Sequence, residues 1–336
     1  MDRTRLAVAP FTISRVDRSP ADHGSVDDGE AAPGSLQGGS VARGVGAPRS
    51  ASPRRGHHRE AAAGRNGQAA ARHPGSAAVF GSSLRGLLWA AAIIIGWLLS
   101  LIVALRLPFQ AGWASVPWLL PLVLIRAFLQ TGLFIVAHDA MHGSLLPGCR
   151  RWNNGIGRLA LTLYAWLPWQ RCRRNHRRHH EGPGSPEDPD HHGPHQAGLL
   201  RWYARFMASY LSPAQMGALL GSWLVLLVLF WSKTPHPLSS LLLFCTLPLL
   251  LSSLQLFVIG TYLPHRQTTC RSGDRHHAAS LAWPEALSFL ACFHFGYHWE
   301  HHADPRLPWY RLPAGRRRMT VPIRQRAALA LPLSSR

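Results

Sequence analysis

Apolar residues are distributed very unevenly along the 336-residue chain. Residues 1–78 consist mainly of Arg, Ala, Gly, Ser and Pro, whereas Leu, Trp, Ile and Val dominate from Leu84 onward. A segment with so few large apolar side chains cannot bury a core. We therefore predict a disordered tail over residues 1–78, a membrane domain over 79–315 and a basic tail over 316–336.

Four apolar stretches approach or exceed the roughly 20 residues that a helix needs to cross a bilayer. They cover residues 86–105, 116–137, 216–231 and 238–263, and Pro248 is a candidate kink in the fourth. The shorter stretches 156–169 and 281–296 are interrupted by prolines and are predicted to be interfacial or re-entrant helices. The pattern predicts an all-α integral membrane protein with about four transmembrane helices.

The distribution of charged residues predicts how the four apolar stretches are oriented in the membrane. The formal net charge is +20 and comes almost entirely from arginine, since Lys233 is the only lysine. The arginines lie in the tail and beside the apolar stretches, which favours contact with anionic headgroups over nucleic-acid binding. Their concentration in the tail, in 143–212 and after His265 predicts that both termini are cytoplasmic. The five scattered cysteines indicate no disulfide framework.

Three histidine clusters follow apolar stretches and carry the candidate chemistry. Their sequences are HDAMH at 138–142, HRRHH at 176–180 and HWEHH at 298–302. Histidines at i, i+3 and i+4 share one helix face, so we expect each cluster to direct its imidazoles toward a single point. The predicted topology places all three clusters on the cytoplasmic side. The expected metal ligands are His138, His142, His176, His179, His180, His298, His301 and His302.

Eight histidines are more than one metal ion can bind, so they predict a polynuclear metal centre. Imidazole binds iron, copper, nickel and zinc, and ligand type alone does not identify the metal. A structural zinc site closes with four ligands and usually recruits cysteine. Eight or nine histidines instead suit two six-coordinate ions with open positions, and two irons that activate dioxygen are the favoured hypothesis. His265, at the end of the fourth apolar stretch, is the expected ninth ligand.

Other residues near the clusters have several possible roles. Asp139 and Glu300 lie inside clusters, so we favour them as the acidic site residues that hold a second imidazole nitrogen. Arg126 could line a cavity, contact another helix or snorkel, and His294 is expected to lie behind the ligands. Acids outside the clusters are less favoured: Asp188, Asp190, Asp274 and Asp304. Aromatic residues could frame a tunnel for a lipophilic substrate or form an interfacial belt: Trp166, Trp169, Phe293, Phe295, Tyr297 and Trp299.

These motifs resemble the membrane fatty acid desaturase superfamily and, within it, the bacterial β-carotene ketolases. The superfamily resemblance rests on the three histidine boxes and their spacing between paired spans. The ketolase resemblance rests on longer strings and covers about residues 85–315, which would form the catalytic domain. The strings are GLFI at 132–135, HDAMHGS at 138–144, DPD at 188–190, RWY at 201–203, GTYLPHR at 260–266, DRHHAAS at 274–280, FHFGYHWEHH at 293–302 and PWYRLP at 308–313.

The resemblance implies a bacterial inner-membrane enzyme with a cytoplasmic, histidine-rich di-iron cap. Such an enzyme would use dioxygen and electrons from a ferredoxin-type donor protein to oxidise C4 of a β-ionone ring. Two hydroxylations at one carbon would give a gem-diol that loses water, so β-carotene would pass through echinenone to canthaxanthin. The nine histidines occupy the family's ligand positions, and Asp139 and Glu300 occupy its acidic positions.

Three alternatives remain open at this point. A carotenoid hydroxylase or an acyl-lipid desaturase or hydroxylase would carry the same histidine boxes. A membrane metal transporter would place ionisable residues along a path across the bilayer. A haem- or quinone-binding anchor would place histidines inside opposing spans, whereas here they lie at the ends of the spans.

Overall fold

The computed structural model describes residues 76–107, 116–191, 198–266 and 274–319, and every regular element within these ranges is helical. Chain contacts divide the protein into residues 1–68 and 69–336, so all described residues belong to the second unit. The tail predicted over 1–78 falls almost entirely outside the described residues, and a helix already begins at Ser76. The basic tail predicted from residue 316 begins inside a helix that continues to residue 319.

Four helical segments are long and apolar enough to cross a membrane, as the hydrophobic pattern predicts. The first three are α1 (Ser76–Arg106), α2 (Val116–His142) and α6 (Pro213–Phe230). Ser212 caps α6 by accepting a hydrogen bond from the Gln215 N–H, and Pro213 occupies its first turn. The fourth segment is composite and runs through α7 (Pro237–Leu241), η2 (Leu242–Thr246), α8 (Leu247–Phe257), η3 (Val258–Tyr262) and α9 (Leu263–His265).

Shorter helices complete the described part of the chain. They are α3 (Arg150–Ala165), α4 (Trp169–Glu181), α5 (Leu199–Tyr210), α10 (Glu285–Cys292), α11 (His298–Ala303) and η4 (Trp309–Arg311). Most of the helix predicted over 156–169 is found in α3, which ends at Ala165 because Trp166 adopts a left-handed conformation and separates α3 from α4. Helix α5 was not predicted, since its arginines mask the apolar face that buries Trp202 and Tyr210.

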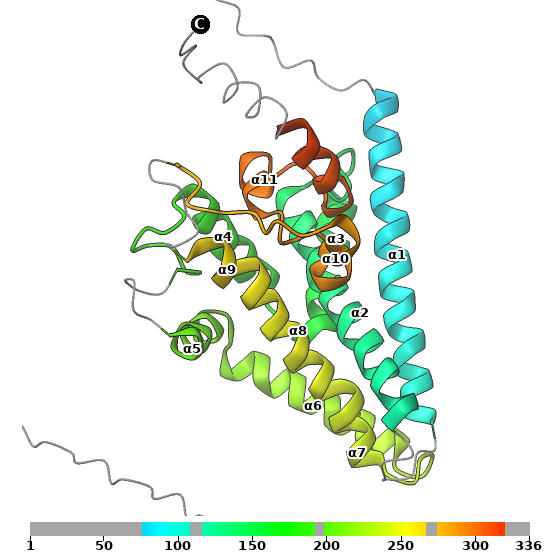
Figure 1. Ribbon diagram of the computed structural model, residues 1–336. Helices are drawn as coiled ribbons and strands as arrows, with labels where there is room; N and C mark the ends of the chain where they lie inside the picture. Colours follow the sequence, from blue (N-terminus) through cyan, green and yellow to red (C-terminus); the bar gives the residue numbers. More distant parts are fainter. Residues whose placement is uncertain (1–75, 108–115, 192–197, 267–273, 320–336) are drawn as a thin grey trace, which may run out of the picture. The chain divides into compact units, whose positions relative to one another are not determined.

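Helix α2 lies at the centre of this arrangement and packs against α1, α3 and α8 (Figure 1). The approach of α3 depends on Gly157, where a Cβ atom would lie 2.7 Å from the Cβ of Ala140 and would collide with the Trp169 ring. The Asn153 side chain also donates a 2.8 Å hydrogen bond to the Ala140 carbonyl on α2. Close packing and a buried polar contact therefore fix α3 to the half of α2 that bears histidines.

Arg126 is buried inside the membrane-spanning part of the fold, with 1% of its surface exposed. Its Nε donates to the Phe244 carbonyl at 2.9 Å, and its Nη1 donates to the Trp97 carbonyl at 3.0 Å. Pro248 has no N–H and cannot donate to Phe244 four residues earlier, as a regular helix would require. The arginine thus supplies a donor at the Phe244 carbonyl, to which Pro248 cannot donate, and the helix adopts a π-helical segment there.

The helices that carry histidines meet at one end of the described fold. In Figure 1, α4, α9 and α11 lie near the C-terminal end of α2, and the turn between α6 and α7 lies at the opposite end. The prediction that all three clusters reach one side is confirmed, because their ring nitrogens approach one another within 4.8 Å in two groups.

We predict that Gly157→Val destabilises the protein by about 1–3 kcal/mol, because the added methyl groups force α3 away from α2 and Trp169. Gly155→Val is the matched control, since Gly155 is exposed and a Cβ there meets nothing within 4 Å. Thermal unfolding of the detergent-purified variants would measure the difference. Equal stability of the two variants would contradict the packing argument.

Candidate metal centre

Nine histidines from four helices form two groups of ring nitrogens. The first histidine group contains His138, His142, His176, His180 and His301, and the second contains His179, His265, His298 and His302. Within each group, one nitrogen from every ring lies within 4.8 Å of the others. Helices α4 and α11 contribute to both groups, whereas α2 contributes only to the first and α9 only to the second.

Histidines that are adjacent in the sequence belong to different groups. His179 and His180 point into different groups, and so do His301 and His302. Successive residues on a helix point about 100° apart, whereas residues four apart lie nearly one above the other. The expectation that each cluster directs its imidazoles toward one point is therefore wrong for the second and third clusters. Each of those clusters serves two sites.

The spacing of the nitrogens fits shared metal ions. The Nε2 atoms of His142 and His176 lie 2.6 Å apart, and those of His180 and His301 lie 3.0 Å apart. In the second group, the Nε2 atom of His302 lies 3.1 Å from that of His179. Two imidazole nitrogens about 2.1 Å from one ion and at right angles to each other would be about 3.0 Å apart. The buried Nε2 atoms of His138 and His265 have no hydrogen-bond partner among the described residues, as expected of ligand atoms.

Burial keeps most of these imidazoles neutral. It is the main cause that lowers the pKa values of His176, His298, His301 and His302 well below the usual histidine value, and the neighbouring histidines lower them further. The pKa of His180 is lowered for the same reasons. A neutral imidazole has the free lone pair that a metal ion requires. The site is therefore prepared to bind cations before any metal enters.

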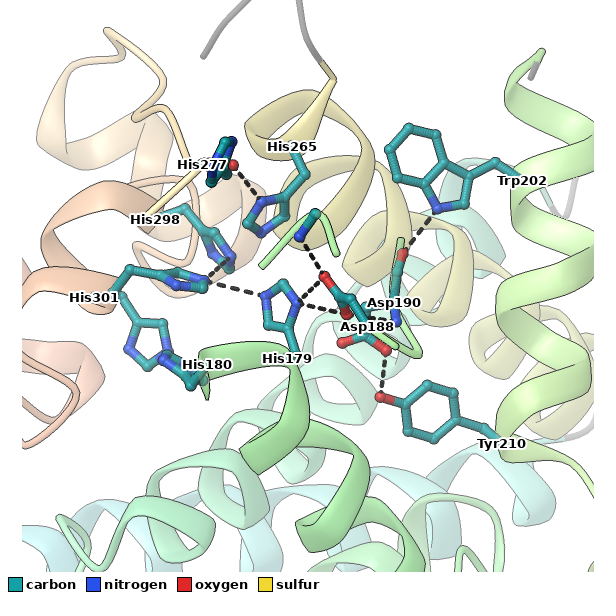
Figure 2. Close-up of polar contacts among 12 residues, drawn as sticks. His179, His180, Asp188, Asp190, Trp202, Tyr210, His265, His277, His298 and His301 are labelled. Carbon is teal, nitrogen blue, oxygen red and sulfur yellow. Dashed lines mark hydrogen bonds and ion pairs between the residues drawn. The ribbon is translucent and has the colours of Figure 1, made fainter. Parts of the chain in front are cut away.

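His179 differs because a carboxylate holds its second nitrogen. Its Nδ1 atom lies 3.0 Å from both carboxylate oxygens of Asp188, and Figure 2 shows Asp188 on the opposite side of the His179 ring from His301. Burial lowers the pKa of His179, but the hydrogen bond that its ring donates to Asp188 and the charges of Asp190 and Asp188 outweigh this effect and raise the pKa. The Asp188 carboxylate in turn accepts the backbone N–H groups of Gly184 and Asp190. This carboxylate therefore fixes which nitrogen His179 presents to its group.

A backbone carbonyl plays the same part for His265. The Nδ1 atom of His265 donates to the carbonyl of His277 at 2.8 Å, which leaves Nε2 for the second histidine group (Figure 2). The sequence predicted no role for His277. The residue is exposed and meets His265 through its backbone carbonyl, so no side-chain pattern could have identified this contact.

Asp139 and Glu300 are placed differently from our expectation. The Asp139 carboxylate accepts the backbone N–H of Trp309 at 3.1 Å, and its nearest approach to the His138 Nδ1 is 3.7 Å. Glu300 accepts a hydrogen bond from the Ser280 hydroxyl and pairs with Arg316 at 3.2 Å. Among the described residues it is therefore Asp188, not Asp139 or Glu300, whose carboxylate lies within hydrogen-bonding distance of a ring nitrogen in the two groups. His294 lies outside both groups, stacked on Tyr297.

An apolar cavity of about 220 Å³ reaches both histidine groups. We call it the histidine cavity. His138 and His176 of the first group and His179 and His298 of the second contribute to its wall. Of the aromatic residues expected to frame a tunnel, Phe295 lines this cavity, whereas Trp299 donates a hydrogen bond to Asp274 instead. Further aromatic lining comes from Phe134, Tyr164, Phe206, Tyr210 and Trp223.

Comparison with known proteins relates this chain to the fatty acid desaturase family and to carotenoid ketolases. Residues 111–231 and 210–326 match the profile of the fatty acid desaturase family. A β-carotene ketolase of Paracoccus sp. strain PC1 is 40% identical over 250 residues, which cover 73% of this chain and 97% of that protein. A β-carotene ketolase of another Paracoccus strain is 43% identical over 56% of this chain and 75% of its own length. A zeaxanthin 4-ketolase of Chlamydomonas reinhardtii is 38% identical over 67% of this chain and 50% of its own.

We predict that Asp188→Asn lowers the affinity of the second histidine group for metal by about 10- to 100-fold, because an amide holds the His179 ring less firmly. Titration of metal-stripped protein with ferrous iron would measure the loss. The matched control is Glu187→Gln, which removes a negative charge from the exposed neighbouring residue. If both variants bind iron like the unaltered protein, Asp188 does not support the site.

Proposed function

Because this chain belongs to the fatty acid desaturase family, we propose that it is a carotenoid 4-ketolase, an oxidoreductase that converts the C4 methylene of a β-ionone ring into a ketone. The observation that carries the proposal is the apolar cavity whose wall includes members of both histidine groups. An apolar ring in this cavity would lie directly beside the candidate metal centre. The ketolase names of the Paracoccus relatives support this choice of substrate.

We assign one iron to each histidine group, nine imidazoles in all. The donor set fits, since the nitrogens of each group are close together and the imidazoles are largely buried. When bound, the metals would supply the activation of dioxygen, which no side chain can perform. The chain itself contributes ligand orientation through Asp188 and the His277 carbonyl.

The walls of the histidine cavity would bind the ring and exclude water. Apolar side chains such as Phe134 and Leu256 provide most of the surface. The one carboxyl group of the wall, Asp190, accepts a 2.6 Å hydrogen bond from the Tyr210 hydroxyl, and burial raises its pKa. Because this hydrogen bond satisfies the carboxyl group within the protein, the group does not draw water into the cavity. The ring carbon can therefore be presented to the oxidant in a dry environment.

Asp139 and Glu300 act in this proposal as positioning residues. Asp139 ties the end of α2 to the backbone at Trp309, and Glu300 ties α11 to Ser280 and Arg316. These contacts fix the helices that carry His138, His142, His298, His301 and His302. Neither carboxylate belongs to the ligand groups, so we assign them no direct contact with the substrate.

The proposed conversion requires two oxidations at one carbon. Each hydroxylation replaces a C–H bond by C–OH, consumes one dioxygen, two electrons and two protons, and releases one water. The resulting gem-diol loses a further water to give the ketone. On this basis β-carotene would yield echinenone after reaction at one ring and canthaxanthin after reaction at both. The relative named as a zeaxanthin 4-ketolase makes 3-hydroxylated rings a second substrate class to test.

The alternatives are less well supported. A metal transporter would place ionisable groups along a path across the bilayer, whereas the nine histidines of the two groups gather at one end and Arg126 is bonded to backbone carbonyls. A carotenoid hydroxylase or acyl-lipid oxidising enzyme remains compatible with the histidine groups. Product analysis distinguishes these enzymes, because each would leave a different functional group.

The electrons would enter from the side of the membrane on which α4 lies, which we assign to the cytoplasm together with both termini. Arg174, Arg177 and Arg178 are exposed and lie three and four residues apart, so they share one face of α4. This face belongs to the helix that holds His176, His179 and His180. It suits an acidic electron-donor protein of the ferredoxin type, which opposite charge would guide toward the metal centre.

We predict that the double variant Arg174→Glu/Arg177→Glu raises the KM for an acidic ferredoxin by about tenfold or more at low salt, because docking becomes repulsive. The difference should shrink as salt screens the charges. Arg150→Glu/Arg151→Glu on α3 is the matched control, since it reverses two exposed charges elsewhere. Steady-state assays at varied donor and salt concentrations would test this, and an equal effect of both double variants would argue against a docking face on α4.

The proposed function is tested by expressing the full chain in a bacterium engineered to make β-carotene and analysing the pigments by chromatography and mass spectrometry. Echinenone and canthaxanthin are expected with the intact protein. His179→Ala should abolish both while leaving the protein in the membrane, whereas the control His236→Ala changes an exposed histidine between α6 and α7 and should not. A hydroxylated product would instead indicate a hydroxylase, and ketone formation by His179→Ala would refute the assignment of this ligand.

A further inference from the structure

A second cavity of about 550 Å³ lies deeper among the membrane-spanning helices. Residues of α1, α2, α3, α6 and the π-helical segment η2 line it, among them Trp97, Arg126, Leu226 and Cys245. We call it the Arg126 cavity. No metal-ligand histidine contributes to its wall among the described residues, so the chemistry proposed above gives it no role.

The two cavities adjoin each other. Tyr164, Leu219, Trp223 and Leu249 line both of them. Along α2 the lining passes from His138 and Phe134 in the histidine cavity to Gln130 and Arg126 in the second.

The same progression occurs on two further helical segments that border both cavities. On α6, Gln215 lines the histidine cavity and Leu226, eleven residues later, lines the Arg126 cavity. On the fourth span the order along the chain is reversed: Gly260 lines the histidine cavity, and the earlier residue Cys245 lines the Arg126 cavity. On all three helical segments, the residues of the histidine cavity lie nearer the histidine end of the fold and those of the Arg126 cavity lie farther from it. The stretch of α2 from His138 to Arg126 alone corresponds to about 18 Å of helical rise.

The polar groups of the Arg126 cavity are already bonded within the protein. Gln130 accepts a 2.6 Å hydrogen bond from the Trp97 indole and donates to the Tyr164 carbonyl. Arg126 donates to the carbonyls of Phe244 and Trp97 and lies over the Trp97 ring. What remains for a ligand is mainly the surface of leucines and aromatic rings, with Trp166 and Trp223 among them. Such a surface suits a long, apolar, conjugated molecule rather than a polar one.

Size gives a reason for connecting the cavities. Sites for drug-sized ligands commonly occupy about 300–1,000 Å³, and the histidine cavity, at about 220 Å³, is smaller than this range. It can hold a β-ionone ring and the start of its chain, but not a whole carotenoid. The larger cavity beyond Tyr164 and Trp223 offers the missing volume.

We propose that the two cavities form one substrate path, in which the reacting ring lies beside the histidines and the polyene chain passes between Tyr164 and Trp223 into the Arg126 cavity. This inference rests on the proposed carotenoid substrate and specifies where the unreacted part of that substrate binds. The Arg126 cavity is then a determinant of chain length. A molecule with the same ring and a short side chain does not need it.

Two neighbouring positions on α6 provide a matched test. Ser222 lines the Arg126 cavity but not the histidine cavity, so Ser222→Phe fills part of the proposed chain path. Gly221 is exposed, and a Cβ there meets nothing within 4 Å, so Gly221→Phe adds the same ring outside the path. Iron content should equal that of the unaltered protein in both variants, because α6 supplies none of the nine histidines.

The variants are compared as full-length, iron-loaded protein with β-carotene and with β-ionone, which carries the same ring on a four-carbon side chain. We expect Ser222→Phe to lower ketone formation from β-carotene by at least about tenfold and to leave the rate with β-ionone essentially unchanged. Gly221→Phe should leave both rates unchanged. Unimpaired conversion of β-carotene by Ser222→Phe would overturn the proposal, as would an equal loss with both substrates at full iron content.

Binding measurements separate this proposal from the proposed function. Purified unaltered protein should retain β-carotene, and Ser222→Phe should retain much less. If the unaltered protein forms no ketone from either substrate but still shows this difference in bound β-carotene, the ketolase assignment fails and the chain path stands. Equal retention by the two proteins would contradict the path whatever the reaction.

Discussion

The convergence of nine histidines depends on the angular offset between neighbouring residues of a helix. Because successive side chains point about 100° apart, α4 and α11 can each contribute to both histidine groups at once. The two groups are consequently held together by shared helices instead of by separate scaffolds. A shift of either helix would disturb both groups, and polar contacts of His179 and Glu300 hold α4 and α11 in place.

These contacts combine short-range and long-range elements. Asp188 lies in the turn directly after α4 and reaches back to His179. Asp139 joins α2 to a segment 170 residues later, and His265 is oriented by a carbonyl 12 residues away. In each case a buried polar group finds its partner inside the protein, as burial requires. Asp188 and the His277 carbonyl also select which ring nitrogen of His179 and of His265 faces the candidate metal centre.

The membrane-spanning half of the fold also contains a buried polar group, the guanidinium of Arg126, that needs hydrogen-bond partners. A buried guanidinium is costly in a bilayer unless its donors are satisfied. Arg126 donates hydrogen bonds to backbone carbonyls of α1 and of the π-helical segment before Pro248. The buried guanidinium thus gains acceptors, and the carbonyl in the irregular helix gains a donor. This arrangement borders the larger of the two cavities that we connect. Polar residues that are bonded internally can thus line a space that remains suited to apolar molecules.

The sequence by itself determined the helical class, the four apolar spans and the identity of the nine candidate ligands. These features depend on local properties: the length of an apolar run, the placement of arginines and the spacing of histidines within a helix. It did not determine how the histidines divide into two groups, which acid supports His179, or what Arg126 contacts. Those outcomes depend on contacts between distant residues, such as His179 with His302, 123 positions apart, and Arg126 with Phe244, 118 apart. Only the packing of the helices decides which of many chemically equivalent partners come within bonding distance.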